Sequence, residues 1–306
     1  MWHDHDAMTA PTGTRPTAAR WRAPLLWRAL QLLARALTAP LARLEVTGDV
    51  PDRLRDGPLI LAVNHIGNFD PVALAAATQT IGVHPRIMAT GGLFRAPIVG
   101  VAMRACGHIR VNRTRVSADE AHAAAAVGDA AAALAAGSVV AGYPEGRITL
   151  DPGLWPERGR SGMARLALTT RVTVVPVAQW GSHELLPYDV PNGLWRTLWR
   201  DLTTRPRVQV HFGAPIDLSD LDPAVRGDVQ RATDRIITAL HTELAPLRAG
   251  EPDLPRHVDP TRRVETRRAF RPGAAVVPGE PGLLPAAGLD VRRDDLPGAG
   301  QAEHQP

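Results

Sequence analysis

Several residue types and patterns are missing from this chain, and each absence excludes something. Cys106 is the only cysteine, so an intramolecular disulfide is excluded and nothing marks an oxidising compartment. No Gly-x-Ser-x-Gly segment occurs, which argues against a hydrolase that carries its serine on a sharp turn. Because no cluster has the spacing of metal ligands, we expect neither a metal nor a bound cofactor.

Lysine is also absent, since all 35 basic residues are arginine. Arginine and alanine enrichment is explained by GC-rich coding, and a net charge of +4 is modest for 306 residues. Tyrosine and phenylalanine total only six and do not cluster with the arginines, unlike the interleaved pattern of nucleic-acid binders. We therefore expect no nucleic-acid partner.

Acidic residues are missing from residues 7–44, where six arginines occur. Within residues 21–44, leucines recur at three- and four-residue steps beside two tryptophans, which predicts an amphipathic helix. Two arginines and a proline interrupt it, so it does not have the run of about 20 apolar residues that spans a membrane. We interpret it as a helix lying on an anionic membrane surface, peripheral or monotopic, at the cytoplasmic face of the cell membrane. The alternative is a leucine face packed on the protein's own core.

The rest of the chain predicts a single α/β domain over residues 45–248, with a mixed, mostly parallel sheet flanked by helices. Strand-like runs alternate with helical ones; they are expected at residues 59–63, 86–89, 108–112, 138–142, 172–178 and 207–212. Residues 1–20 are expected to be disordered. The same holds for 249–306, because 9 prolines and 7 glycines fall within 250–306 without an apolar period.

His65 and Asp70, with four residues between them, form the most informative pair. They lie between a buried strand and a helix that Asp70 is expected to cap. An imidazole held by a carboxylate can take a proton from an alcohol near neutral pH. The alternative is a purely structural role, in which Asp70 only caps the helix and His65 donates a hydrogen bond to a loop carbonyl.

Three further segments, residues 107–113, 143–147 and 174–177, lie at or just after strand-like runs. Together with 64–70, their order and spacing resemble the four motif blocks of the 1-acyl-glycerol-3-phosphate acyltransferase family, over roughly residues 45–215. The resemblance implies that His65, oriented by Asp70, deprotonates the acceptor hydroxyl, which then attacks an acyl thioester directly. No enzyme nucleophile is needed in that scheme.

The resemblance also implies substrate-binding roles. Arg113 falls at the position that holds the acceptor's phosphate, and Glu145 and Gly146 fall in the block that helps to form the phosphate pocket. Since a glutamate cannot attract phosphate, we expect Glu145 to support an arginine or loop amides and Gly146 to let the backbone come close. Pro176 matches the fourth block, where strand packing explains it.

Arg147 departs from the family pattern, because the family continues Gly-Thr-Arg where this chain has Gly146, Arg147 and Ile148. A one-residue shift turns a side chain to the opposite face of an extended segment. Arginine is long, however, and no other cation occupies the expected place. We therefore favour Arg147 as a second phosphate ligand beside Arg113.

These observations predict an acyltransferase that moves a fatty acyl group from coenzyme A or acyl carrier protein to the hydroxyl of 1-acyl-glycerol 3-phosphate, giving phosphatidic acid. A related enzyme acylating glycerol 3-phosphate or another polar lipid alcohol is the first alternative. The alternative from another class is a non-catalytic, arginine-rich membrane or nucleic-acid binding protein, which would need neither His65 nor Asp70.

Overall fold

A seven-stranded sheet organises the chain, in the order β1-β7-β6-β2-β5-β3-β4. The computed structural model describes residues 21–112, 119–189 and 194–272. Neighbouring strands are parallel except β6 and β7, so the sheet is mixed and mostly parallel, as predicted. The strands are β1 (Arg43–Gly48), β2 (Leu59–Val63), β3 (Arg86–Thr90), β4 (Ile109–Val111), β5 (Val139–Gly142), β6 (Val174–Trp180) and β7 (Arg207–Phe212).

Strand β1 was not predicted from the sequence. The expected helix over residues 21–44 ends earlier, since α1 spans Leu25–Leu41, and the chain then turns into β1. This edge strand pairs with β7 alone. Its central residues are half-buried and its ends are exposed, so buried and exposed side chains do not alternate along it. A strand of that kind has no strong period-two signal.

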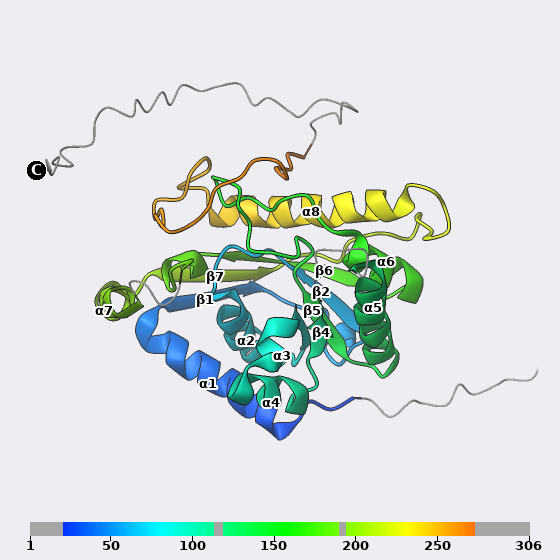
Figure 1. The fold of residues 1–306 in the computed structure, drawn as a ribbon, viewed down its shortest axis with the longest axis horizontal. Helices are drawn as coiled ribbons and strands as arrows, with labels where there is room; N and C mark the ends of the chain where they lie inside the picture. Colours follow the sequence, from blue (N-terminus) through cyan, green and yellow to red (C-terminus); the bar gives the residue numbers. More distant parts are fainter. Residues whose placement is uncertain (1–20, 113–118, 190–193, 273–306) are drawn as a thin grey trace, which may run out of the picture. The chain divides into compact units, whose positions relative to one another are not determined.

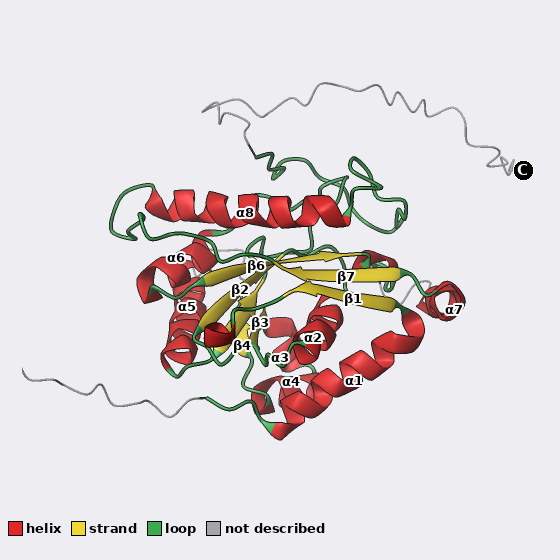
Figure 2. Cartoon of the chain, turned by 180° about the vertical axis from the view of Figure 1, so that it is seen from behind, coloured by secondary structure: helices red, strands yellow, loops and turns green. Residues whose placement is uncertain are grey.

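Helices cover both faces of the sheet (Figures 1 and 2). On one face α2 (Asp70–Thr80) lies against the strands and α1 packs on α2, with α3 (Gly91–Arg95) and α4 (Pro97–Ala105) nearby. On the other face lie α5 (Asp119–Ala135), α6 (Ser161–Thr170) and α8 (Asp228–Leu247). Helix α7 (Leu194–Thr204) lies beside α1, and the described residues also contain two short 3₁₀ helices, η1 (Asp52–Leu54) and η2 (Ser182–Glu184).

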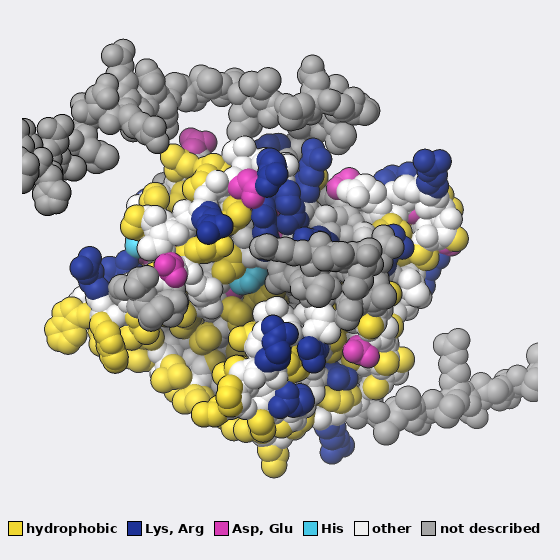
Figure 3. Space-filling view, in the orientation of Figure 1, with side chains coloured by type: hydrophobic (Ala, Val, Ile, Leu, Met, Phe, Trp, Pro, Cys, Tyr) yellow, Lys and Arg dark blue, Asp and Glu magenta, His cyan; other side chains and the backbone are white. Residues whose placement is uncertain are grey.

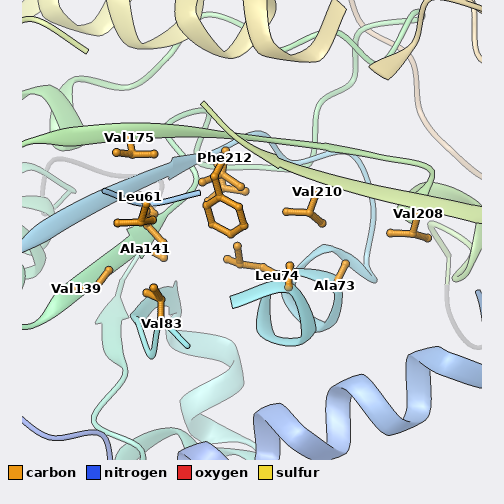
Figure 4. Packing of buried hydrophobic residues seen from close by; sticks show 14 of the residues in the cluster. Leu61, Ala73, Leu74, Val83, Val139, Ala141, Val175, Val208, Val210 and Phe212 are labelled. Atoms are coloured by element: carbon orange, nitrogen blue, oxygen red, sulfur yellow. The ribbon is translucent and has the colours of Figure 1, made fainter. Parts of the chain in front are cut away.

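The central strand β2 explains why both faces must be covered. Its alternate residues Leu59, Leu61 and Val63 face the α2 side, whereas Ile60 and Ala62 face α5, α6 and α8. All five are fully buried. Figure 4 shows Leu61 among side chains of β5, β6, β7 and α2. A strand buried on both faces reads as a continuous apolar run, which is how the sequence revealed it.

The predicted domain end at residue 248 is wrong. Residues 249–272 pack on the domain: Glu157 forms a bridge with Ala269, and the indole nitrogen of Trp180 donates to Glu251 at 2.8 Å. Arg271 pairs with the fully buried Asp151 at 2.9 Å. Polar contacts therefore hold residues 249–272 against the domain. Such contacts need no regular spacing of apolar residues, so no sequence pattern reveals them. The predictions for residues 1–20 and 273–306 fall outside the described residues.

Candidate active site

The predicted site lies at the carboxyl edge of two neighbouring parallel strands. His65 follows β2, residues 143–147 follow β5, and β2 pairs with β5 in parallel register. The ends of such strands meet at one edge of a sheet, which is where open α/β folds build their sites. The topology therefore brings two segments together that are about 80 residues apart in the chain.

Asp70 is the fully buried centre of the site. Its Oδ2 accepts hydrogen bonds from His65 Nδ1 at 2.7 Å and from the backbone N–H groups of Ile66 and Gly67 at 2.6 and 3.0 Å. Its Oδ1 accepts from Ser182 Oγ at 2.5 Å. The expectation that Asp70 caps α2 is wrong, since Asp70 is the first helical residue and its carboxylate turns back onto the preceding loop.

His65 is oriented by two contacts. Its Nδ1 lies on the Asp70 carboxylate, and its ring stacks on Tyr143 with centroids 4.1 Å apart and planes at 20°. Because an ionised carboxylate can only accept a hydrogen bond, Nδ1 carries the proton and Nε2 holds the lone pair. The side chain is 17% exposed, so a substrate can reach it. The pair thus has the geometry of an oriented general base.

Ser182 was missed by the sequence reasoning. It begins η2 directly after β6, which neighbours β2, so it arrives at the same edge of the sheet. Gly67 makes the approach close, because a Cβ added there would lie 2.8 Å from the Cα of His183. The turn into η2 uses Gly181 at φ 85°, a conformation that glycine adopts readily. The separation of 112 residues between Ser182 and Asp70 carries no sequence signal.

Glu145 supports the backbone of the His65 loop. It is fully buried, its Oε1 accepts from the backbone N–H of His65 at 2.9 Å, and its Oε2 accepts from that of Glu157 at 2.9 Å. Burial raises the pKa of Glu145 to about 8, although these two hydrogen bonds favour the ionised form. Of the two roles expected for Glu145, the structure gives it the loop amides. Gly146 has φ 71° and lies against the side chain of Arg160.

Arg147 does not have the surroundings that its predicted role requires. Its Nε and Nη2 bind the two carboxylate oxygens of the fully buried Glu157, each at 2.8 Å, and its Nη1 lies 3.3 Å from Glu265. The planar fork that would hold two phosphate oxygens therefore holds a carboxylate instead. We reassign Arg147 to the structure of this loop, because moving it to a substrate would leave the buried Glu157 with only the longer contact to Arg268, at 3.8 Å.

Arg113 lies outside the described residues, so its predicted contact with the acceptor's phosphate stays a prediction. Within residues 21–112, 119–189 and 194–272, no group of three or more His, Cys, Asp or Glu side chains could hold a metal ion. In the same part of the chain, no helix has both the length and the apolar character needed to cross a bilayer.

Comparisons with known proteins bear on the family and the fold of this chain. A family model described as Acyltransferase matches residues 43–180, a range that holds β1 to β6 and the loops of His65 and Glu145. An uncharacterized protein of Mycobacterium tuberculosis is 32% identical over 157 residues, which cover 47% of this chain and 39% of that protein. A Mycobacterium leprae protein is 31% identical over 157 residues, covering 47% and 38%. The chain thus spans about two fifths of the length of these curated relatives.

A solved structure shares the fold. The crystal structure of PlsC, a 1-acyl-sn-glycerophosphate acyltransferase from Thermotoga maritima, matches with a TM-score of 0.53 and 18% identity. The match covers 73% of this chain and 80% of that chain. This chain therefore shares the α/β fold of a solved acyltransferase, and over residues 43–180 its sequence matches the acyltransferase family model.

Proposed function

We propose that this protein transfers a fatty acyl group from an acyl thioester to the free hydroxyl of 1-acyl-glycerol 3-phosphate, with His65 as general base. The observation that carries the proposal is the buried Asp70 carboxylate 2.7 Å from His65 Nδ1. In this mechanism Nε2 takes the proton of the acceptor hydroxyl as its oxygen attacks the thioester carbonyl. Asp70 stabilises the imidazolium that forms.

The surroundings of Cys106, the one cysteine in the chain, argue against a cysteine nucleophile and so support direct attack by the acceptor. Cys106 is fully buried, and burial raises the pKa of its thiol. A reactive cysteine needs the opposite, a lowered pKa and access to the substrate. The thiolate that leaves the thioester can recover a proton from the His65 imidazolium, so the base returns to its neutral form after each turnover.

The proposed acceptor follows the family resemblance and the substrate after which PlsC of Thermotoga maritima is named. An acyltransferase for glycerol 3-phosphate or another polar lipid alcohol remains the alternative, since Arg113 lies outside the described residues. The non-catalytic alternative gives no reason for an imidazole and a buried carboxylate to be held together by Tyr143 and Ser182.

A lipid acceptor would be met at a membrane surface, and the exposed side chains support this part of the proposal. Helix α1 packs on the protein through Trp27, Gln31 and Thr38, which are buried, and the exposed leucines on its outer side support a contact with the membrane. Further exposed apolar side chains lie on α4 and α7, and Figure 3 shows hydrophobic side chains gathered over this part of the molecule. They include Leu25, Leu32, Leu33, Leu37, Ile98, Val101, Trp195 and Trp199.

The membrane assignment has its own test, which is sedimentation with anionic liposomes. Replacing Leu33 and Leu37 with serine should move the protein to the supernatant, because each leucine loses about 1.5–3 kcal/mol of burial in the lipid. The matched control is Val258→Ser and Val264→Ser, which change exposed apolar residues of the segment that follows α8. Equal pelleting of both double variants and the wild type would contradict the assignment.

The test of the reaction is an assay of purified full-length protein with palmitoyl-coenzyme A and a panel of acceptors. The panel holds lysophosphatidate, glycerol 3-phosphate, a monoacylglycerol and other lysolipids, and both thiol release and the acylated product are followed. We expect the highest efficiency with lysophosphatidate and a rate about 10² to 10⁴ times lower for His65→Ala. Activity that is unaffected by that substitution would refute the mechanism.

A further inference from the structure

A cavity of about 460 Å³ lies at the outer edge of the sheet, beside the edge strand β4 and between α5 and the end of α4. It lies three strands from the His65 loop. His108 and Arg110 belong to the motif block 107–113, but the role that the family resemblance assigns to that block falls on Arg113, so the cavity itself has no assigned role. Three arginines line it together with Phe94, His108 and Asp129; they are Arg86, Arg104 and Arg110, and we call it the arginine cavity.

Among the described residues, each of the three guanidinium groups is held by one hydrogen bond to the protein. Arg104 Nη1 donates to the backbone oxygen of Phe94 at 2.8 Å, Arg110 Nε donates to Asn112 at 2.7 Å, and Arg86 Nε donates to the backbone oxygen of Gly107. Each of these bonds uses a single N–H of a group that carries several. The remaining donors form a fixed cationic surface, which suits the oxygens of a phosphate.

The charge in the cavity is positive. Asp129 is the one acidic side chain among its lining residues, against three arginines. His108 adds no charge near neutral pH, because burial and the nearby Arg86 lower its pKa to about 4. Burial also lowers the pKa of Arg86, more than the nearby Asp129 raises it. An anion in the cavity would offset the cost of burying that cation.

The position of the arginine cavity distinguishes the phosphate of the acceptor from the phosphates of a coenzyme A donor. Strand β4 is three strands from β2, which corresponds to about 14 Å across the sheet. Arg110 reaches the carboxyl edge, because a Cβ added to Gly91 just after β3 would lie 3.1 Å from its Nε. The phosphate of a glycerol phosphate acceptor is only a few bonds from the reacting hydroxyl, so it cannot occupy the cavity while that hydroxyl is at His65. The phosphates of coenzyme A are joined to the thioester by a long pantetheine arm, so they can occupy the cavity while the thioester lies at His65.

We propose that the arginine cavity binds the phosphate groups of a coenzyme A donor while its thioester lies at His65. The inference rests on the proposed acyl transfer, and it selects coenzyme A over acyl carrier protein as the donor. The same phosphate chemistry occurs in phospholipid headgroups, and α4 exposes Ile98 and Val101 near Arg104. The experiment therefore has to separate a soluble donor from a lipid headgroup.

The kinetic arm compares two donors that carry the same acyl group. Palmitoyl-coenzyme A has the phosphates, whereas palmitoyl-N-acetylcysteamine has none. We expect Arg104→Ala with Arg110→Ala to raise the KM for palmitoyl-coenzyme A about 10- to 100-fold, and that for the phosphate-free thioester less than about twofold. Arg95→Ala, which changes an arginine of α3 outside the cavity, is the matched control. Asp129→Asn should act in the opposite direction and lower the KM for palmitoyl-coenzyme A.

The binding arm does not depend on turnover. Adenosine 3′,5′-bisphosphate is titrated calorimetrically into the full-length wild type and into the double variant, and binding is expected only to the wild type. This result would support the cavity even if no acyl transfer were found. Equal loss of efficiency on both donors, unchanged KM values, or a wild type that does not bind the bisphosphate would overturn the proposal. So would a double variant that keeps its coenzyme A kinetics and loses binding to anionic vesicles, because the phosphate would then be a lipid headgroup.

Discussion

Replacing Asp70 with asparagine tests the proposed base most directly, because it removes a charge and leaves the shape. An alanine at this position would leave the amides of Ile66 and Gly67 and the hydroxyl of Ser182 without their acceptor, at about 1–3 kcal/mol each. Asparagine keeps a carbonyl oxygen for His65 and the loop amides. Its NH₂ group then faces Ser182, whose hydroxyl can rotate to accept. We therefore expect Asp70→Asn to fold.

The rate should nevertheless fall by about two to three orders of magnitude. Protonated His65 and the Asp70 carboxylate have charge centres roughly 4 Å apart, which gives about 4 kcal/mol at an effective dielectric constant near 20. Because His65 is 17% exposed, solvent screens part of this, and about 3–4 kcal/mol remains. At about 1.4 kcal/mol for each factor of ten, the loss in kcat is about 10² to 10³.

The assay is thiol release under saturating donor and acceptor, with circular dichroism and a melting curve to verify folding. Asp52→Asn changes an exposed aspartate of η1 and serves as the matched control. A folded Asp70→Asn protein whose kcat stays within about threefold of wild type would refute the role of the carboxylate, since a charge effect of the size worked out from the structure could not be so small.

Three other perturbations have defined outcomes. Ser182→Ala should lower kcat about 3- to 30-fold with an unchanged KM, because the Asp70 carboxylate that orients His65 loses one hydrogen bond. A rise in KM as large as the fall in kcat would indicate a merely structural role. Burial raises the folded-state pKa of Glu145 from 4.5 to about 8, so its contribution to stability is full below pH 4.5 and is lost as the pH rises through about 8. Glu145→Gln should flatten the fall in Tm over that window, and identical Tm profiles would contradict the shifted pKa. Ending the chain at Pro272 should leave Tm unchanged, whereas ending it at Leu247 should lower Tm by about 5–15 °C; equal Tm values would show that residues 248–272 contribute nothing.

Most of the sheet could be predicted from the sequence, because a strand buried on both faces is a run of apolar residues whatever its neighbours are. Six strands were recognised in this way, and β1 was missed since an edge strand with half-buried residues lacks that run. The pair His65 and Asp70 was found because the two residues lie close together in the sequence, on either side of the short turn between β2 and α2. That turn fixes their distance almost independently of the rest of the fold.

Partners that come from elsewhere in the fold could not be predicted. Ser182 reaches Asp70 only because β6 neighbours β2, and Glu157 binds Arg147 only because the loop after β5 folds back on itself. The order of residues 249–272 was missed for the same reason. Its contacts are single polar pairs with distant residues, such as Arg271 with Asp151, and composition does not reveal them.

The four hydrogen bonds to the Asp70 carboxylate have a consequence for how this enzyme tolerates variation. One buried group joins the loop after β2, the start of α2 and the turn after β6, so it is both a part of the reaction centre and a fastening of three segments. In a saturation library scored for cellular abundance and for turnover, substitutions at Asp70 other than asparagine should depress both scores together. Substitutions at His65 should depress turnover alone. Such divergence between the two positions would distinguish a chemical role from an architectural one without a structure of a substrate complex.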